Sequence, residues 1–288
     1  MTRTLVQHHR LPSGAAGAPP DRTDLSERAR DWAEIQERML VPLYEAVYER
    51  LEVRGGTRLL ALGCGSGLAL LLAASRGARV TGVDSDHERL ALARERLRAP
   101  GERARPGGAP AVTGTLVPAD RMAEAAGPDR PPYDVITAFQ PLGHTADGVP
   151  GLGRAIPLAR RGAPVVLAGW GPPERCATDA VLRIGGRLTD RLRKGGRRPA
   201  HRDDLEDVAA RAGLEPDGSG RVACPFGYAD TGSAVRGLLS TGAFDGAIRA
   251  TDRRQVEKEI GEALHPHVRR DGTVWMPNVF RYLIARTP

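Results

Sequence analysis

Cysteine is scarce in this chain of 288 residues, and long apolar runs are missing. The three cysteines, Cys64, Cys176 and Cys224, are scattered and form no Cys-x-x-Cys pair, which excludes a disulfide framework and the common cysteine-based metal sites. No apolar run approaches the roughly 18 residues of a membrane span. The first residues also lack the apolar core of a secretory signal. We therefore expect a cytoplasmic protein with no membrane partner and no metal.

Lysine is nearly absent as well. Lys194 and Lys258 are the only two, so arginine carries almost all of the positive charge behind the net charge of +7. The densest basic run, residues 187–202, has no aromatic side chain on which bases could stack. The abundance of Arg, Ala and Gly is typical of GC-rich coding. The charge therefore favours a solvated surface, with an RNA or anionic-ligand contact as the alternative.

The chain divides into a tail, a helix and an alternation of strands with helices. Residues 1–23 lack periodicity and predict a flexible tail, whereas residues 24–50 carry apolar residues at helical spacing and predict a helix that Pro42 kinks or splits. Further helices are predicted at 68–75, 87–98 and 202–212, and in inserted segments at 171–200 and 229–268. Strands are predicted at 58–62, 79–83, 113–117, 133–139, 164–170, 221–226 and 275–285. Such alternation predicts a doubly wound α/β sheet with both faces covered.

A glycine-rich turn gives the sharpest signal. The strand 58–62 runs into Gly63-Cys64-Gly65-Ser66-Gly67, and a helix follows at once. Glycines there permit a tight turn and close approach of a ligand to the backbone. The dinucleotide fingerprint needs a third glycine three residues after the second, but this chain has Leu68 there. The P-loop Gly-Lys-Ser/Thr is also missing, which excludes that nucleotide site.

An acid follows at the end of the next strand. Asp84 lies where a carboxylate can accept both hydroxyls of an adenosine ribose. The turn GCGSG, the strand VTGVD, Ala119-Asp120 after the third strand and YDVITAF at the fourth together resemble the class I S-adenosylmethionine-dependent methyltransferases. The likeness covers residues 55–170, and the overall pattern is similar to that of the ubiquinone/menaquinone-type C-methyltransferases and their small-molecule relatives.

The resemblance implies a fold and a set of site residues. The fold would be Rossmann-like, with a mixed seven-stranded sheet whose last strand is antiparallel. It would form a single domain over residues 24–288, closed by a helical lid from 24–50 and the two insertions. The cofactor, S-adenosylmethionine, would lie on Gly63, Cys64, Gly65 and Gly67, with Asp84, Ser85 and Asp86 beside the adenosine, Asp120, Arg121 and Met122 around the adenine, and Phe139 and Gln140 near the sulfonium.

Histidines offer few catalytic candidates. His144 follows the fourth strand, where a neutral imidazole could take a proton from an acceptor hydroxyl. A surface-loop histidine is the alternative interpretation. His265 and His267 flank Pro266 and lack the further ligands that a metal site needs. The Pro131-Pro132-Tyr133 stretch precedes the fourth strand rather than following it, so it is not the signature of an amino-group methyltransferase.

The resemblance predicts methyl transfer to a small organic molecule, with specialised metabolism as an analogy only. An RNA methyltransferase is one alternative, and it would need a basic, aromatic-lined groove. A non-catalytic cofactor-binding regulatory protein is another, because no strong base is obvious. The sequence leaves the acceptor and the oligomeric state open.

Overall fold

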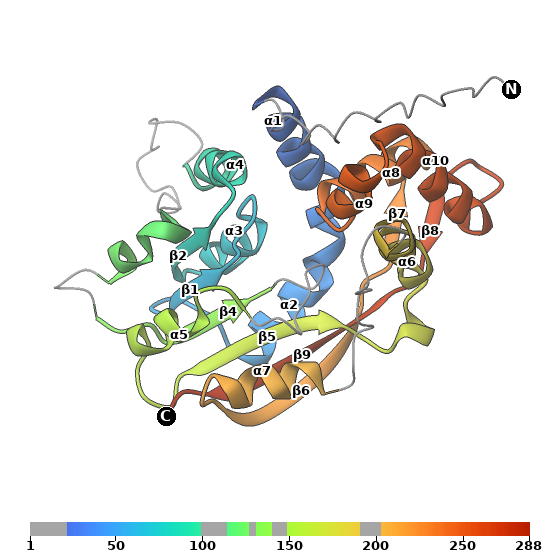
Figure 1. Ribbon diagram of the computed structural model, residues 1–288. Helices are drawn as coiled ribbons and strands as arrows, with labels where there is room; N and C mark the ends of the chain where they lie inside the picture. Colours follow the sequence, from blue (N-terminus) through green and yellow to red (C-terminus); the bar gives the residue numbers. More distant parts are fainter. Residues whose placement is uncertain (1–21, 99–113, 127–130, 140–148, 191–202) are drawn as a thin grey trace, which may run out of the picture.

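A twisted seven-stranded sheet forms the centre of the molecule (Figure 1). The computed structural model describes residues 22–98, 114–126, 131–139, 149–190 and 203–288. The predicted tail 1–23 lies almost entirely outside these residues. The strands of the sheet are β1 (Arg58–Leu62), β2 (Arg79–Asp84), β3 (Gly114–Pro118), β4 (Val135–Ala138), β5 (Pro164–Trp170), β6 (Glu215–Ala223) and β9 (Val279–Arg286).

The strand order confirms the predicted doubly wound, mixed sheet. It runs β3-β2-β1-β4-β5-β9-β6, with the first five strands parallel and β9 antiparallel to both of its neighbours. The order reverses between β1 and β4, and such a switch point is where open α/β sheets bind their ligands, at the carboxyl ends of the strands.

Both faces of the sheet are buried, which explains its apolar strands. In β1, Leu59 and Ala61 join one core cluster, whereas Leu60 and Leu62 join the other. Side chains alternate along a strand, so a run without polar residues is the pattern expected for a sheet covered on both sides. Gly82 in β2 serves the same packing, since a Cβ there would lie 2.5 Å from Leu70 Cδ1.

Helices cover the two faces and build a cap above one end of the sheet (Figure 1). The helices that flank the sheet are α2 (Val41–Arg50), α3 (Leu68–Ser75), α4 (His87–Leu97), α5 (Leu152–Ala155) and α7 (Asp204–Arg211). The cap, called the lid below, consists of α1 (Arg22–Asp31) with the two irregular turns that follow it (residues 32–40), α6 (Thr178–Asp190), α8 (Thr231–Ser240), α9 (Asp245–Ala250), α10 (Arg253–Leu264) and a ribbon of β7 (Phe226–Tyr228) and β8 (Val274–Met276). Its segments are distant in sequence but pack on one another, as α1 does on α8 and α6 on α9.

The N-terminal helical segment is not one regular helix. Between α1 and α2 lie a π-helical turn, Trp32–Gln36, and a 3-10 turn, Glu37–Leu40. Pro42 lies in the first turn of α2, so the predicted split at this proline is confirmed. The segment begins at Arg22, slightly before the predicted residue 24.

Two predicted strands are wrong in extent. The predicted strand 221–226 is β6, which begins at Glu215 and ends at Ala223, followed by the separate β7. The predicted strand 275–285 is likewise two strands, β8 and β9. Pro225 separates β6 from β7, and Pro277 separates β8 from β9, because proline has no N–H to donate to a strand pair. The Cys224 N–H donates to the Asn278 carbonyl over 2.9 Å, so both breaks lie side by side.

In the described segments, no helix has the length and apolar character needed to cross a membrane.

Candidate functional site

The glycine turn lies at the switch point of the sheet. It connects β1 to α3, and Gly63, Gly65 and Gly67 all have positive φ, at 63°, 57° and 82°. Residues other than glycine rarely adopt this left-handed backbone conformation. At Gly67 a Cβ would also lie 2.9 Å from Ala93 Cβ of α4. The turn therefore requires its glycines, and it leads directly into the first backbone N–H groups of α3.

Asp84 ties the turn to the end of β2. Its Oδ2 accepts from the Gly65 N–H at 2.7 Å, and its Oδ1 accepts from the Asp86 N–H at 2.9 Å. Each carboxylate oxygen keeps a lone pair. Asp86 in turn caps α4 by accepting from the Glu88 and Arg89 N–H groups, while Ser85 is exposed. The structure thus brings the predicted ribose acid and the glycine turn into direct contact.

The residues predicted around the adenine divide between surface and core. Asp84 is paired in register with Pro118, and Asp120 follows at the same edge with an exposed side chain. Arg121 is exposed and pairs with Glu124 at 3.6 Å, whereas Met122 is 2% exposed and packs in the core cluster beneath the sheet. The adenine role of these residues stays a prediction.

Phe139 follows β4 and faces an aromatic pair of the N-terminal segment. Its ring centroid lies 5.0 Å from that of Tyr44 and 5.9 Å from that of Tyr48. Tyr48 donates its hydroxyl to the Ala69 carbonyl, which fixes α2 against α3. Tyr44 and Phe139 thus form an apolar wall beside the turn. Gln140 and His144, both predicted here, lie outside the described residues.

A buried acid on the 3-10 turn contacts the glycine turn, and the sequence analysis missed it. Glu37 is 1% exposed. Its Oε2 accepts from Ser66 Oγ at 2.5 Å and from Arg96 Nη1 at 2.6 Å, and its Oε1 lies 3.4 Å from the Leu68 N–H. A regular helical period through residues 24–50 does not predict its position, because Glu37 lies on a 3-10 turn that follows a π-helical turn.

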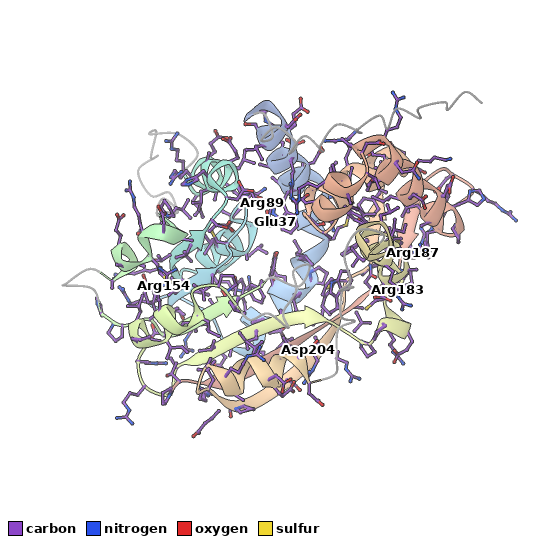
Figure 2. The ribbon with its side chains drawn as sticks, viewed as in Figure 1. Glu37, Arg89, Arg154, Arg183, Arg187 and Asp204 are labelled. Carbon is purple, nitrogen blue, oxygen red and sulfur yellow. The ribbon has the colours of Figure 1, made fainter. Side chains whose placement is uncertain are left out.

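Arg89 connects α4 and the end of β2 to the lid (Figure 2). From α4, its Nη2 donates to the Ser240 carbonyl of α8 at 2.7 Å, and its Nε lies 3.3 Å from Asp86 Oδ2. Its Cζ stacks 4.4 Å from the centroid of the Trp32 ring. Burial lowers the pKa of Arg89, while the carboxylates of Asp86 and Asp84 raise it. One side chain thus touches α4, α8 and the π-helical turn.

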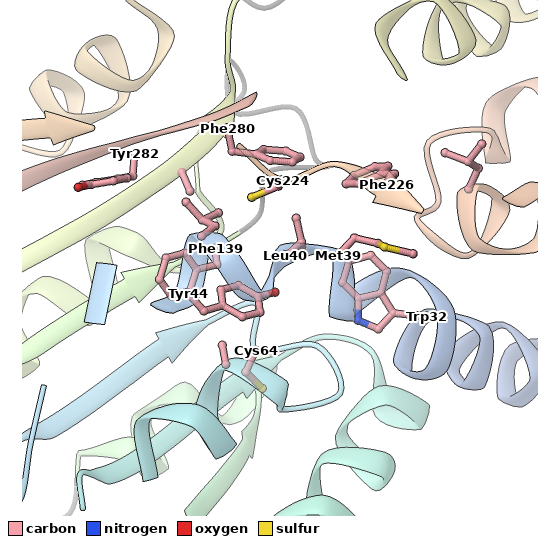
Figure 3. Packing of buried hydrophobic residues seen from close by; sticks show 14 of the residues in the cluster. Trp32, Met39, Leu40, Tyr44, Cys64, Phe139, Cys224, Phe226, Phe280 and Tyr282 are labelled. Carbon is pink, nitrogen blue, oxygen red and sulfur yellow. The ribbon is translucent and has the colours of Figure 1, made fainter. Parts of the chain in front are cut away.

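A second aromatic group lies above the first (Figure 3). The Phe280 ring centroid lies 4.5 Å from that of Trp170 and 6.0 Å from that of Phe226. Trp170 Nε1 is buried and donates to no partner within the described part of the chain. Buried indole N–H groups usually find an acceptor.

The thiol and the phenol nearest the turn are held neutral. Burial raises the pKa of the Cys64 thiol, and the carboxylates of Asp84 and Glu37 raise it further. Burial also raises the pKa of Tyr44, with Glu37 adding to the effect. A thiol of this kind is a poor nucleophile. The segments that the structure describes contain no group of three or more His, Cys, Asp or Glu residues placed to hold a metal ion.

Residues 59–150 match the family model of a methyltransferase domain. Among solved structures, YjhP of Escherichia coli is 19% identical, covering 91% of this chain and 99% of its own, with a TM-score of 0.50. A putative methyltransferase of Bacillus halodurans is 14% identical over 84% and 98% of the two chains, with a TM-score of 0.48. Geranyl diphosphate C-methyltransferase of Streptomyces coelicolor is 16% identical over 85% and 75%, with a TM-score of 0.45. No curated protein sequence matches significantly.

The family match covers the glycine turn, Asp84 and Phe139, and the sheet order places these residues at one edge. Over residues 59–150 the sequence of this chain therefore matches a methyltransferase domain, and the sheet order is consistent with that match.

Proposed function

We propose that this protein transfers the methyl group of S-adenosylmethionine to a small organic molecule held between the glycine turn and the lid. The carrying observation is a pair of apolar ring contacts, Tyr44 with Phe139 and Trp170 with Phe280, in the core cluster that also contains Cys64 of the turn. The turn fits the cofactor because Gly65 leaves a space that a Cβ would fill, bounded by Trp32 Nε1 at 3.0 Å and Glu37 Oε1 at 3.1 Å.

In this proposal Asp84 accepts from the ribose hydroxyls with the lone pairs that Gly65 and Asp86 leave free. Gly63, Cys64 and Gly67 shape the turn beneath the methionine end of the cofactor. Asp120, with Arg121 and Ser85, lies at the adenine side. When bound, S-adenosylmethionine supplies an electrophilic methyl group on a sulfonium. Phe139 presents an apolar surface towards that group.

The chain's own contribution to the reaction is alignment and exclusion of water. A methyl transfer to a good nucleophile needs no strong base, but it needs acceptor and donor held in line in a dry site. Tyr44 is neutral at physiological pH because burial and Glu37 raise its pKa. It can donate a hydrogen bond to an acceptor oxygen, and it cannot act as a base.

The described arginines around the turn favour a small acceptor over RNA. Arg96 is paired with Glu37, Arg89 with Asp86 and the Ser240 carbonyl, and Arg28 with Asp245 at 3.0 Å. These cations are used within the protein rather than presented to phosphates. An RNA enzyme would need an open basic groove with aromatic side chains for stacking.

A methyl-transfer assay with labelled S-adenosylmethionine tests the proposal. The acceptors are a panel of small phenols, amines and carboxylic acids in one arm and total RNA in the other. Label in the small molecules, with S-adenosylhomocysteine as co-product, is the expected result. Label in RNA alone would favour the nucleic-acid alternative. Cofactor binding without turnover in either arm would favour a regulatory protein.

The sequence-based assignment of His144 as general base stays a proposal, because this residue lies outside the described segments. If the acceptor is a hydroxyl, His144→Ala is expected to lower turnover at least about tenfold, at the lower end of the usual effect of a lost general base. The affinity for S-adenosylhomocysteine should stay unchanged. Unchanged turnover would show that His144 takes no proton.

A further inference from the structure

Two polar atoms of the lid lie directly against the glycine turn. Trp32 Nε1 and Glu37 Oε1 are the nearest atoms to the empty Cβ position of Gly65, at 3.0 and 3.1 Å. Both come from the irregular turns between α1 and α2, and both residues are more than nine-tenths buried. Figure 3 shows the indole nitrogen of Trp32 on the side that faces the turn at Cys64.

The hydrogen-bonding capacity of these atoms is incomplete. Trp32 Nε1 is a buried donor with no partner within the described residues. Glu37 Oε2 is occupied by Arg96 and Ser66, but Oε1 has only a long contact of 3.4 Å to the Leu68 N–H. A carboxylate offers about four acceptor positions. One unpaired donor and one underused anionic acceptor therefore lie together, and unpaired buried polar groups cost free energy unless a ligand completes them.

The chemistry of the turn indicates which ligand group completes the pair. The amino-acid end of S-adenosylmethionine carries one ammonium and one carboxylate, and both must find partners when the lid buries them. A carboxylate can accept from an indole N–H and from the N–H groups at the start of α3. An ammonium needs an anionic acceptor, which Glu37 Oε1 supplies beside the same glycine.

We propose that Trp32 and Glu37 form a receptor on the lid for the amino-acid end of the cofactor: Glu37 accepts from its ammonium and Trp32 donates to its carboxylate. The inference rests on the proposed function, since it assumes that the cofactor lies on the turn. It assigns the lid a role in cofactor recognition in addition to covering the acceptor.

Two ligands separate this role from a structural one. S-adenosylhomocysteine has the amino-acid end, whereas 5′-methylthioadenosine keeps the adenosine and the sulfur but lacks that end. Calorimetric titration of Glu37→Gln and Trp32→Phe should show S-adenosylhomocysteine binding weakened roughly ten- to a hundredfold, the size of a lost hydrogen bond to a charged group. Affinity for 5′-methylthioadenosine should stay within about twofold.

Matched controls are available in the same protein. Glu34→Gln changes an exposed acid of the same π-helical turn, and Trp275→Phe changes an indole that is 39% exposed on β8. Both should bind the two ligands as the unchanged protein does. Trp32→Phe keeps an aromatic ring beneath Arg89, so it tests the N–H alone.

A ligand-side arm needs no variant. S-adenosylhomocysteine without its amino group should bind the unchanged protein about as weakly as Glu37→Gln binds the complete ligand, with no further loss on combining the two changes. If Glu37→Gln does not fold, as judged by circular dichroism, this arm and Trp32→Phe decide the question.

Three results would overturn the inference. A parallel loss of affinity for both ligands would mean that Trp32 and Glu37 only hold the lid on the turn, and no loss for either would remove their role altogether. In both cases cofactor binding by the unchanged protein, and with it the proposed function, would stand. Failure of the unchanged protein to bind either ligand would overturn both proposals.

Discussion

At the scale of single residues, Gly65 has a left-handed backbone conformation, and neighbouring side chains leave little room for a Cβ atom. An alanine there must adopt φ near 57° and place its Cβ against Trp32 and Glu37. Gly213 has a similar φ of 69°, but a Cβ there meets nothing within 4 Å. Gly213→Ala should therefore lower the free energy of unfolding by about 1–2 kcal/mol, from backbone strain alone. Gly65→Ala should cost about 1–3 kcal/mol more from overpacking.

Urea unfolding of both variants measures this difference, and titration with S-adenosylhomocysteine measures its effect on the site. Gly65→Ala should also weaken cofactor binding, whereas Gly213→Ala should not. Equal destabilisation of the two variants would contradict the tight contact between the lid and the turn.

Asp84 offers a second test at this scale. Asp84→Asn keeps the size of the side chain but removes the charge that pairs with Gly65 and that we propose for the ribose. Affinity for S-adenosylhomocysteine should fall by about 1.5–3 kcal/mol. Asp207→Asn, an exposed change on α7, is the control. Wild-type affinity in a folded Asp84→Asn protein would remove Asp84 from the ribose site.

The residues that could be predicted from sequence are those whose signal is local. Gly63, Gly65 and Gly67 are required by one short turn, and Asp84 ends the next strand, so a few adjacent letters suffice. Glu37 could not be found in this way. The π-helical and 3-10 turns shift the phase of the helix, so a regular 3.6-residue period does not predict which side Glu37 faces.

At the scale of elements, Arg89 holds α4, α8 and the π-helical turn together. Arg89→Ala removes the bond to the Ser240 carbonyl and the stack on Trp32, so α8 and α1 should open more often. We expect faster amide hydrogen exchange in residues 22–36 and 231–240, with little change in β1 and β4. Arg94→Ala, an exposed change on the same helix, is the control. Unchanged exchange in both segments would show that the lid is held by its apolar contacts alone.

Most elements between residues 58 and 170 lie close to their predicted bounds, because short apolar runs mark the strands and glycines follow β1, α3 and β5. The prediction was less successful after Gly171. Residues 215–220 contain little apolar sequence, yet they form β6 because β9 offers an antiparallel ladder on one side, with one irregularity between Pro216 and Gly218. Tertiary pairing supplies what the local sequence lacks. Pro225 and Pro277 were the visible signals of the two breaks.

At the scale of the whole molecule, two buried cysteine thiols should make the free energy of unfolding fall as the pH becomes alkaline. Burial raises the pKa of Cys224 to about 12 and that of Cys64 well above its ordinary value. An unfolded cysteine ionises near 8.5. Above that pH the unfolded chain binds fewer protons than the folded one, so the free energy of unfolding falls as pH rises. We expect roughly 1–2 kcal/mol lost per buried thiol between pH 8 and pH 10.

Urea unfolding at both pH values checks this prediction. Cys224→Ala should show a smaller fall than the unchanged protein, since one ionisable group is gone. An identical fall in the two proteins would mean that Cys224 does not contribute.

The adjacent breaks at Cys224 and Asn278 have a consequence for how such a protein diversifies. The Cys224 N–H donates to the Asn278 carbonyl directly beyond the paired ends of β6 and β9. Residues 224–278 are therefore, in topological terms, the loop of one hairpin between these two strands. Long loops add little closure entropy beyond short ones. The segment can therefore be exchanged as a cassette, with its ends already joined, while β6 and β9 stay paired. The glycine turn and Asp84 lie outside this cassette, so its replacement would change the lid, including the Ser240 carbonyl that Arg89 contacts, and leave those residues in place.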